Sequence, residues 1–245
     1  MNPTLLLIAP LIGWLAGATA NWAADILPGW SSLNPEQRLP RTVTALGHYA
    51  TLPWYFRRHG ACPHCGQTRT WRAPAVEIAM IVSYLLLALR FGGSAEELVV
   101  SWLYAWFLIC VLVIDLETRR VLNVMLLPAA FVALGISLAL GLPPIGSALI
   151  GGLVAFVLFG LLFVIGRTLF GSGALGMGDV KLVAVIGLMV GYPDILHALV
   201  VGALAGAGAA IYLLATRRAT LKSTSAYAPY LAVGALSALW NVWGK

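Results

Sequence analysis

Long apolar runs, separated by short polar segments, dominate the sequence. Eight of the runs reach or approach the roughly 20 residues that a helix needs to cross a bilayer. They lie at about 3–24, 74–91, 97–115, 121–141, 146–166, 180–193, 194–215 and 227–243. The first run lacks a basic leading region and is followed by further runs, so we interpret it as a retained helix rather than a signal peptide. The pattern predicts an all-α membrane protein, a polytopic bundle of about eight transmembrane helices.

The polar residues predict three parts along the chain: a first transmembrane helix at 1–24, a long loop at 25–73 and a helical membrane domain at 74–245. The loop is the only long polar segment. Its five prolines argue against a long helix, and they are Pro28, Pro35, Pro40, Pro53 and Pro63.

The basic residues predict the orientation of the bundle. With these eight runs, four segments share one side of the bilayer: 25–73, 115–120, 167–179 and 216–226. Counting Lys181 at the edge of the third segment, only Arg90 and Lys245 of the 15 Lys and Arg residues fall on the other side. The positive-inside rule makes the basic side, including the long loop, cytoplasmic. Topology therefore accounts for the net charge of +6, and no nucleic-acid partner is predicted.

Two aspartates stand at the ends of apolar runs on the predicted cytoplasmic side. Asp115 ends the run 97–115, and Asp179 precedes the run 180–193. Ionisable groups at membrane segments are costly and indicate a functional site. Two neighbouring carboxylates can share a proton, so that one is the base and the other the acid when water attacks a peptide carbonyl. The alternative is that each aspartate caps a helix, with Asp179 as the N-cap before Val180.

The sixth run is too short for an ordinary crossing. A helix over 180–191 rises only about 18 Å, against roughly 30 Å of hydrocarbon. Residues 176–179 are therefore predicted to dip into a recessed, partly hydrated pocket, because non-helical backbone at that depth must be buried or line a wet cavity. We expect Gly176 and Gly178 to let the backbone unwind around Asp179 and admit substrate.

The long loop contains Cys62-Pro63-His64-Cys65, which is half of a zinc knuckle. A structural zinc needs four ligands, and Cys110 cannot contribute because it lies inside a predicted span. The further candidate ligands are His48, His59 and His64. The alternative is a turn with free thiols, and a disulfide is disfavoured on the reducing side of the membrane.

Together, these motifs resemble those of the type IV prepilin peptidases, which are membrane aspartic proteases of the Gly-x-Gly-Asp class. The resemblance covers nearly the whole chain and is most specific at 114–120 with Asn123 and at 176–182, which are similar to the family's two catalytic-aspartate segments. Further similarities are Gly13, Gly17 and Asn21, Leu27-Pro28, Cys62-x-x-Cys65, Pro74-x-Val76-Glu77, and 228–232 with Gly234-Ala235.

The resemblance implies that Asp115 and Asp179 cleave the basic leader from prepilins or pseudopilins at the cytoplasmic face of the bacterial inner membrane, without a cofactor. The substrate's apolar helix would lie in the lipid bilayer beside the bundle. We assign substrate binding to Glu117, which is acidic and close to Asp115, and to Gly176, Gly178 and Lys181 of the second aspartate segment.

Many members of that family also methylate the new N-terminus with S-adenosylmethionine, and these generally carry two zinc-binding Cys-x-x-Cys pairs. This chain has only Cys62 and Cys65, and Leu122 precedes Asn123 where the family usually has proline. Methylation, and a zinc ion on Cys62 and Cys65, therefore stay open as predictions.

Three other functions are compatible with the pattern. A peptidase of the same class could act on another substrate, such as a preflagellin. A proton-coupled transporter or channel could use Asp115 and Asp179 as a relay, although transporters often have broken helices in both halves and only the sixth run here looks broken. A catalytically silent scaffold would be favoured by the loss of an aspartate, and both are present.

Overall fold

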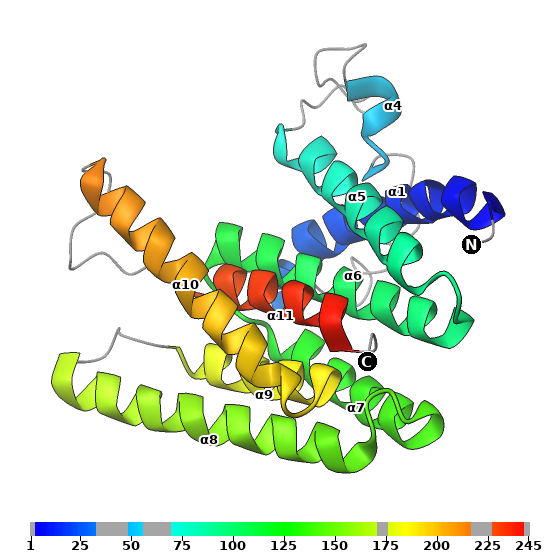
Figure 1. Cartoon of the computed structure of the whole chain (residues 1–245). Helices are drawn as coiled ribbons and strands as arrows, with labels where there is room; N and C mark the ends of the chain where they lie inside the picture. The colour runs from blue at the N-terminus through cyan, green and yellow to red at the C-terminus, as the bar shows by residue number, and fades with distance from the viewer. Residues whose placement is uncertain (1–2, 33–48, 56–69, 171–175, 217–226, 243–245) are drawn as a thin grey trace. The chain divides into compact units, whose positions relative to one another are not determined.

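The computed structural model describes residues 3–32, 49–55, 70–170, 176–216 and 227–242. These residues form α-helices and one 3₁₀ helix, with no strand among them (Figure 1). The elements are α1 (Pro3–Ile26), η1 (Leu27–Ser32), α4 (Leu52–Tyr55), α5 (Arg72–Phe91), α6 (Ala95–Thr118), α7 (Asn123–Leu140), α8 (Ile145–Phe170), α9 (Met177–Val190), α10 (Asp194–Ala215) and α11 (Ala228–Val242).

The long helices coincide with the predicted apolar runs. Six of the described helices are long and apolar enough to cross a membrane, namely α1, α5, α6, α7, α8 and α10. The remaining two runs form α9 and α11, which have 14 and 15 residues. The predicted all-α, multi-pass membrane fold is confirmed, and so is the unusual shortness of the sixth run.

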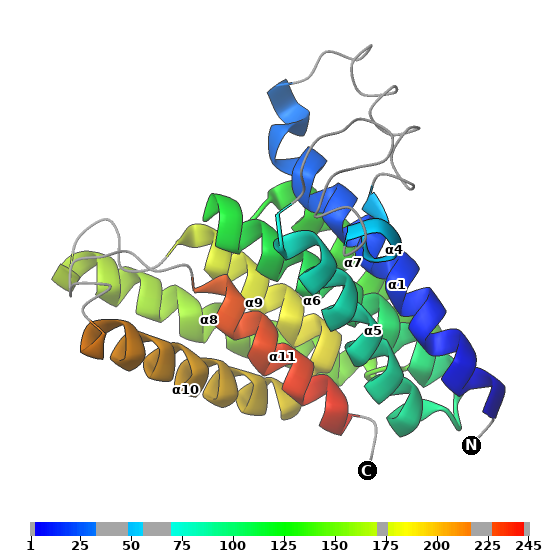
Figure 2. The same cartoon turned by 90° about the horizontal axis from the view of Figure 1, so that it is seen from above.

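The chain divides into two compact units, Met1–Val113 and Ile114–Lys245. In the first unit, α1 packs along α5 (Figure 2). Gly17 makes this close approach possible, because a Cβ atom at that position would lie 2.6 Å from the Cα atom of Glu77. The Arg72 guanidinium, at the start of α5, also contacts the Asp25 carboxylate near the end of α1 at 2.6 Å.

A fully buried carboxylate, Glu77, organises the interior of the first unit. It accepts hydrogen bonds from Trp14 Nε1 at 2.8 Å, from the backbone N–H and hydroxyl of Thr51 at 2.6 Å each, and from the Leu52 N–H at 2.9 Å. These donors offset the cost of removing a carboxylate from water. They also fix the residues that lead into α4 against α5.

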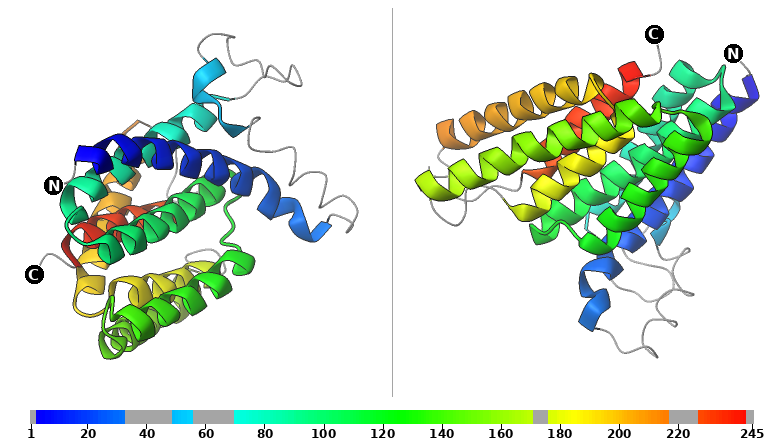
Figure 3. Two further views of the ribbon diagram at one scale, coloured as in Figure 1. Left: turned by 90° about the vertical axis from the view of Figure 1, so that its right-hand side faces the viewer. Right: turned by 90° about the horizontal axis from the view of Figure 1, so that it is seen from below.

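In the second unit, α9 lies among α7, α8, α10 and α11 and contacts all four. Figure 3 shows α8 and α9 running side by side. The side chains of Val180, Leu182, Val183 and Ile186 are buried, because neighbouring helices surround α9. The unit therefore holds the first turn of α9, which carries Asp179, in a fixed setting.

Candidate active site

Asp115 lies in the last turn of α6 and is only 4% exposed. Its backbone carbonyl accepts a hydrogen bond from the Arg119 N–H at 2.8 Å. Arg119 has a φ of 52°, a left-handed conformation that commonly ends a helix but is uncommon for residues other than glycine. α6 therefore ends at Thr118, three residues after Asp115, and the chain turns into the short connection that leads to α7.

Asp179 is the third residue of α9 and is half-buried. Gly176 is the N-cap, in an extended conformation with φ −85° and ψ 144°. The Gly176 N–H donates to Asp179 Oδ2 at 3.2 Å, and the Asp179 N–H donates to the Gly176 carbonyl at 3.1 Å. This reciprocal pair of hydrogen bonds resembles a capping box, and it holds the Asp179 carboxylate at the N-terminus of α9.

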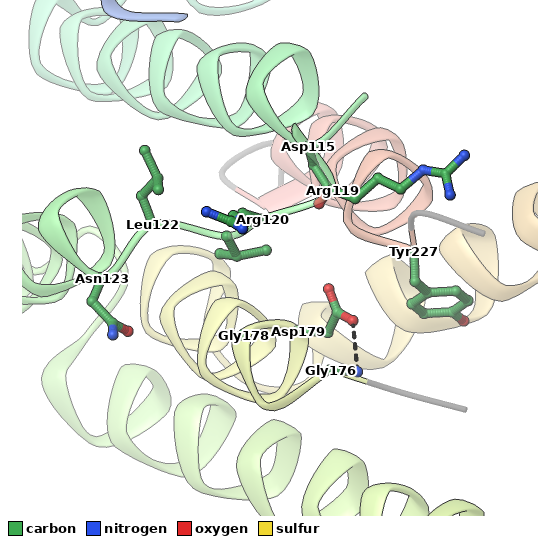
Figure 4. Close-up of a pocket in the computed structure, with 10 residues that line it drawn as sticks. Asp115, Arg119, Arg120, Leu122, Asn123, Gly176, Gly178, Asp179 and Tyr227 are labelled. Atoms are coloured by element: carbon green, nitrogen blue, oxygen red, sulfur yellow. Dashed lines mark hydrogen bonds between the residues drawn. The ribbon is translucent and has the colours of Figure 1, made fainter. Parts of the chain in front are cut away.

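The two aspartates line one pocket of about 540 Å³, and Figure 4 shows their carboxylates pointing toward one another across it. The pocket is also lined by Arg119, Arg120, Val121, Leu122, Asn123, Gly176, Gly178 and Tyr227. Asp115 Oδ2 is buried and has no hydrogen-bond partner among the described residues. A buried carboxylate oxygen without a hydrogen-bond partner costs stability, and a catalytic role is one reason for a protein to keep such a group. This pocket is therefore the candidate active site.

The geometry of the two glycines differs from the expectation. Gly176 is extended, but Gly178 lies inside α9, so the backbone is helical at Asp179 and does not unwind around it. A Cβ atom at residue 178 would lie 3.0 Å from Val121 Cβ. Gly178 therefore lets α9 approach the connection between α6 and α7. The alternative that Asp179 caps a helix is wrong in position only: Gly176 is the N-cap, and Asp179, the third residue of α9, accepts a hydrogen bond from the Gly176 N–H.

The other predicted site residues are placed differently. Glu117 is exposed in the last turn of α6, two residues after Asp115, and is not among the residues that line the pocket. Lys181 is also exposed and outside the lining, and its Nζ donates to Asn123 Oδ1 at 3.2 Å. Cys62 and Cys65 lie outside the described residues. Elsewhere, in the described residues, no three His, Cys, Asp or Glu side chains form a group that could hold a metal.

Sequence reasoning missed Tyr227, which precedes α11 and lines the pocket. The centre of its ring lies 6.1 Å from that of Phe159 and 6.3 Å from that of Tyr230. Residue 227 is about 50 positions from Asp179 along the chain, and no motif marked it. The two pocket arginines belonged to a recognised segment, but nothing in the sequence showed that they share a cavity with both aspartates.

Comparison with known proteins finds that the segment carrying this pocket is similar to one family of peptidases. The sequence model of the type IV leader peptidase family matches residues 102–211, a segment that contains both Asp115 and Asp179. The prepilin leader peptidase/N-methyltransferase of Pseudomonas putida is 27% identical over 76% of this chain and 65% of its own length. The proteins of the same name from Dickeya chrysanthemi and Myxococcus xanthus are both 29% identical, over 79% and 89% of this chain and 68% and 66% of their own lengths.

This chain thus spans about two thirds of the length of these curated relatives. No solved structure matches it. Several relatives share one name, and the family match includes both pocket aspartates: residues 102–211 of this chain are similar to the type IV leader peptidase family.

Proposed function

We propose that this protein is an intramembrane aspartic endopeptidase that removes the basic leader from prepilins or pseudopilins. One observation carries the proposal. The carboxylates of Asp115 and Asp179 come from different helices and face one another in one pocket, where Asp115 Oδ2 has no partner among the described residues. The names of the relatives, which specify prepilin leader peptidases, support the same reaction.

The chemistry follows from the proximity of two like charges. Because both carboxylates resist ionising together, one holds a proton while the other is ionised. The ionised member takes a proton from a water molecule, whose oxygen attacks the scissile carbonyl carbon. The protonated member donates its proton to the carbonyl oxygen, and a proton is later passed to the leaving amine as the carbon–nitrogen bond breaks. Asp179 is held ready for this exchange by the Gly176 N–H.

The proposed location is the cytoplasmic face of the bacterial inner membrane. Asp115 ends a helix long enough to cross a bilayer, and the arginines that follow it, Arg119 and Arg120, are exposed. Basic residues next to the end of a span favour the cytoplasmic side. A substrate whose apolar helix lies in the bilayer would then present its leader junction at the pocket.

The decisive test is cleavage of a candidate prepilin by the full chain. Wild-type protein is reconstituted with the prepilin, and the pilin N-terminus is measured by mass spectrometry. Removal of the leader supports the peptidase proposal.

The names of the relatives include N-methyltransferase, so we further propose methylation by S-adenosylmethionine. The same spectrum reports it as an added mass of one methyl group.

The relay transporter is not favoured, because the segment with both aspartates is similar to a peptidase family and the relatives are named as peptidases. A proteoliposome assay separates the two functions. A transporter would move protons across the membrane of vesicles that contain no prepilin, and a peptidase would not.

We propose that Glu117 binds the basic residues of the leader, because Glu117 is exposed and lies two residues after Asp115. Glu117→Gln is expected to raise KM about fivefold with kcat nearly unchanged, as for a lost exposed charge interaction of ~1 kcal/mol. Steady-state kinetics on a leader-containing peptide measures both constants. The matched control is Glu96→Gln, in the first turn of the same helix. A large fall in kcat with unchanged KM would instead place Glu117 in the chemistry.

For Cys62 and Cys65 we propose a role in the loop and not in peptide cleavage. The double variant Cys62→Ser with Cys65→Ser is expected to keep leader cleavage within a fewfold of wild type, because Asp115 and Asp179 both lie in the second unit and the loop lies in the first. Loss of cleavage in a well-inserted double variant would make the loop part of the active site.

Elemental analysis of purified wild-type protein tests the metal. About one zinc ion per chain would support a histidine-assisted site, and about half would support a site shared between two chains. If zinc is bound, its removal is expected to lower loop stability, since metal binding contributes folding free energy.

A further inference from the structure

Lys181 forms a hydrogen bond between α9, which carries Asp179, and the start of α7, which follows Asp115 along the chain. It lies two residues after Asp179 in α9, and its Nζ donates to the side-chain oxygen of Asn123 at 3.2 Å. Asn123 is the first residue of α7 and lines the pocket. The connection between α6 and α7 begins four residues after Asp115. The hydrogen bond therefore joins the first turn of α9 to the end of this connection.

A second contact joins the same two segments. Gly178 lies so close to Val121 that a Cβ atom on the glycine would be 3.0 Å from Val121 Cβ. Val121 belongs to the connection between α6 and α7, two residues before Asn123. Gly178 directly precedes Asp179. A polar contact and a steric contact thus flank the second aspartate, at residues 181 and 178.

The local hydrogen bonds of the aspartates do not set the distance between them. The Asp115 backbone carbonyl accepts from the Arg119 N–H within the end of its own helix, and the Asp115 carboxyl group is bonded to the backbone of Ala228 at the start of α11. The Asp179 carboxylate is bonded to Gly176, within the start of its own helix. No hydrogen bond among these joins the two carboxylates to each other, so their spacing depends on how α9 is held against residues 119–123 and against α11.

We propose that Lys181 is a positioning residue that, through Asn123, fixes α9 against the connection after Asp115 and so sets the separation of the two carboxylates. This inference rests on the proposed peptidase function and replaces the substrate-binding role that the sequence suggested for Lys181. A lysine suits the task, since its ammonium group only donates hydrogen bonds and the asparagine oxygen accepts one. Displacing a reacting group by about 1 Å can cost on the order of 100-fold in rate.

Lys181→Met is therefore expected to lower kcat roughly 10- to 100-fold while KM stays within about twofold of wild type. Lys181→Arg, which keeps a donor, is expected to recover most of the rate. Asn123→Leu should lower kcat as Lys181→Met does. The double variant should be no slower than the poorer single variant, because both changes remove one interaction. Arg167→Met is the matched control, since Arg167 is an exposed basic residue in the last turn of α8 outside the pocket.

Two kinetic results would overturn the proposal. A rise in KM with unchanged kcat in Lys181→Met would restore a substrate-binding role. Multiplying effects of Lys181→Met and Asn123→Leu would show that the two side chains act separately.

Hydrogen exchange of backbone amides provides a readout that needs no substrate. Residues 119–123 should exchange faster in Lys181→Met than in wild type, and an unchanged rate would contradict the positioning role. If wild-type protein cleaved no prepilin, the proposed function would fail, while the exchange experiment would still decide whether Lys181 holds the two segments together.

Discussion

Asp115→Asn and Asp179→Asn are each expected to abolish leader cleavage, with losses of roughly 1000-fold or more in kcat. An amide is nearly isosteric with a carboxyl group, but it can neither take a proton from water nor pass one to the leaving amine. In the proposed mechanism the two aspartates act in one step, so the double variant should be about as slow as either single variant. Single-turnover cleavage of a prepilin peptide, followed by mass spectrometry, measures these losses.

Insertion of the variants must be shown separately. Each should purify in the same amount and with the same melting temperature as wild type to within a few degrees. Asp194→Asn is a suitable control, since Asp194 begins α10 and does not line the pocket. A well-inserted Asp115→Asn or Asp179→Asn protein with near-normal kcat would remove that aspartate from the mechanism.

Gly178→Val is expected to lower kcat by about 100-fold. A Cβ atom at residue 178 would already lie 3.0 Å from Val121 Cβ, and valine adds two more methyl groups there. The first turn of α9 and the connection after Asp115 would have to separate, which moves the carboxylates apart and costs rate as other misplacements of reacting groups do. Gly178→Ala should cost less, because only one atom is added. The measurement is kcat on a prepilin peptide.

The matched control for this prediction is Gly208→Val in α10. No atom lies within 4 Å of a Cβ built at Gly208, so the change adds volume to open space and should leave kcat within about twofold of wild type. The opposite pattern, with Gly208→Val inactive and Gly178→Val active, would mean that the active site has been placed on the wrong helices.

The membrane helices could be predicted from the sequence because lipid imposes a simple rule on the chain. A segment in hydrocarbon must satisfy its own backbone hydrogen bonds and carry apolar side chains, so span positions follow from composition alone. The short sixth run was visible for the same reason. Its surroundings were not visible, since the packing of α7, α8, α10 and α11 around α9 depends on contacts between residues far apart in the sequence.

The aspartates could be predicted as candidates, but the conformation around them could not. An ionisable group at a membrane segment is costly, and this cost, together with the Gly-x-Gly-Asp pattern, marked Asp115 and Asp179. The glycines beside Asp179 were expected to unwind the backbone. The helix in fact starts at Met177, because Gly176 and Asp179 exchange two hydrogen bonds. Glycine is compatible with both outcomes, so residue type did not discriminate between them.

The sequence by itself determined the all-α membrane fold. It also predicted the orientation and the pair of aspartates, and these two stay predictions; all three depend on local composition or on a short motif. Only the tertiary structure showed that Asp115 and Asp179 face one shared pocket, that Tyr227 lines it and that Lys181 reaches Asn123. These contacts join residues between 48 and 112 positions apart. Such contacts depend on how whole helices pack against one another. The energy of that packing is spread over many side chains, so no single segment of the sequence reveals it.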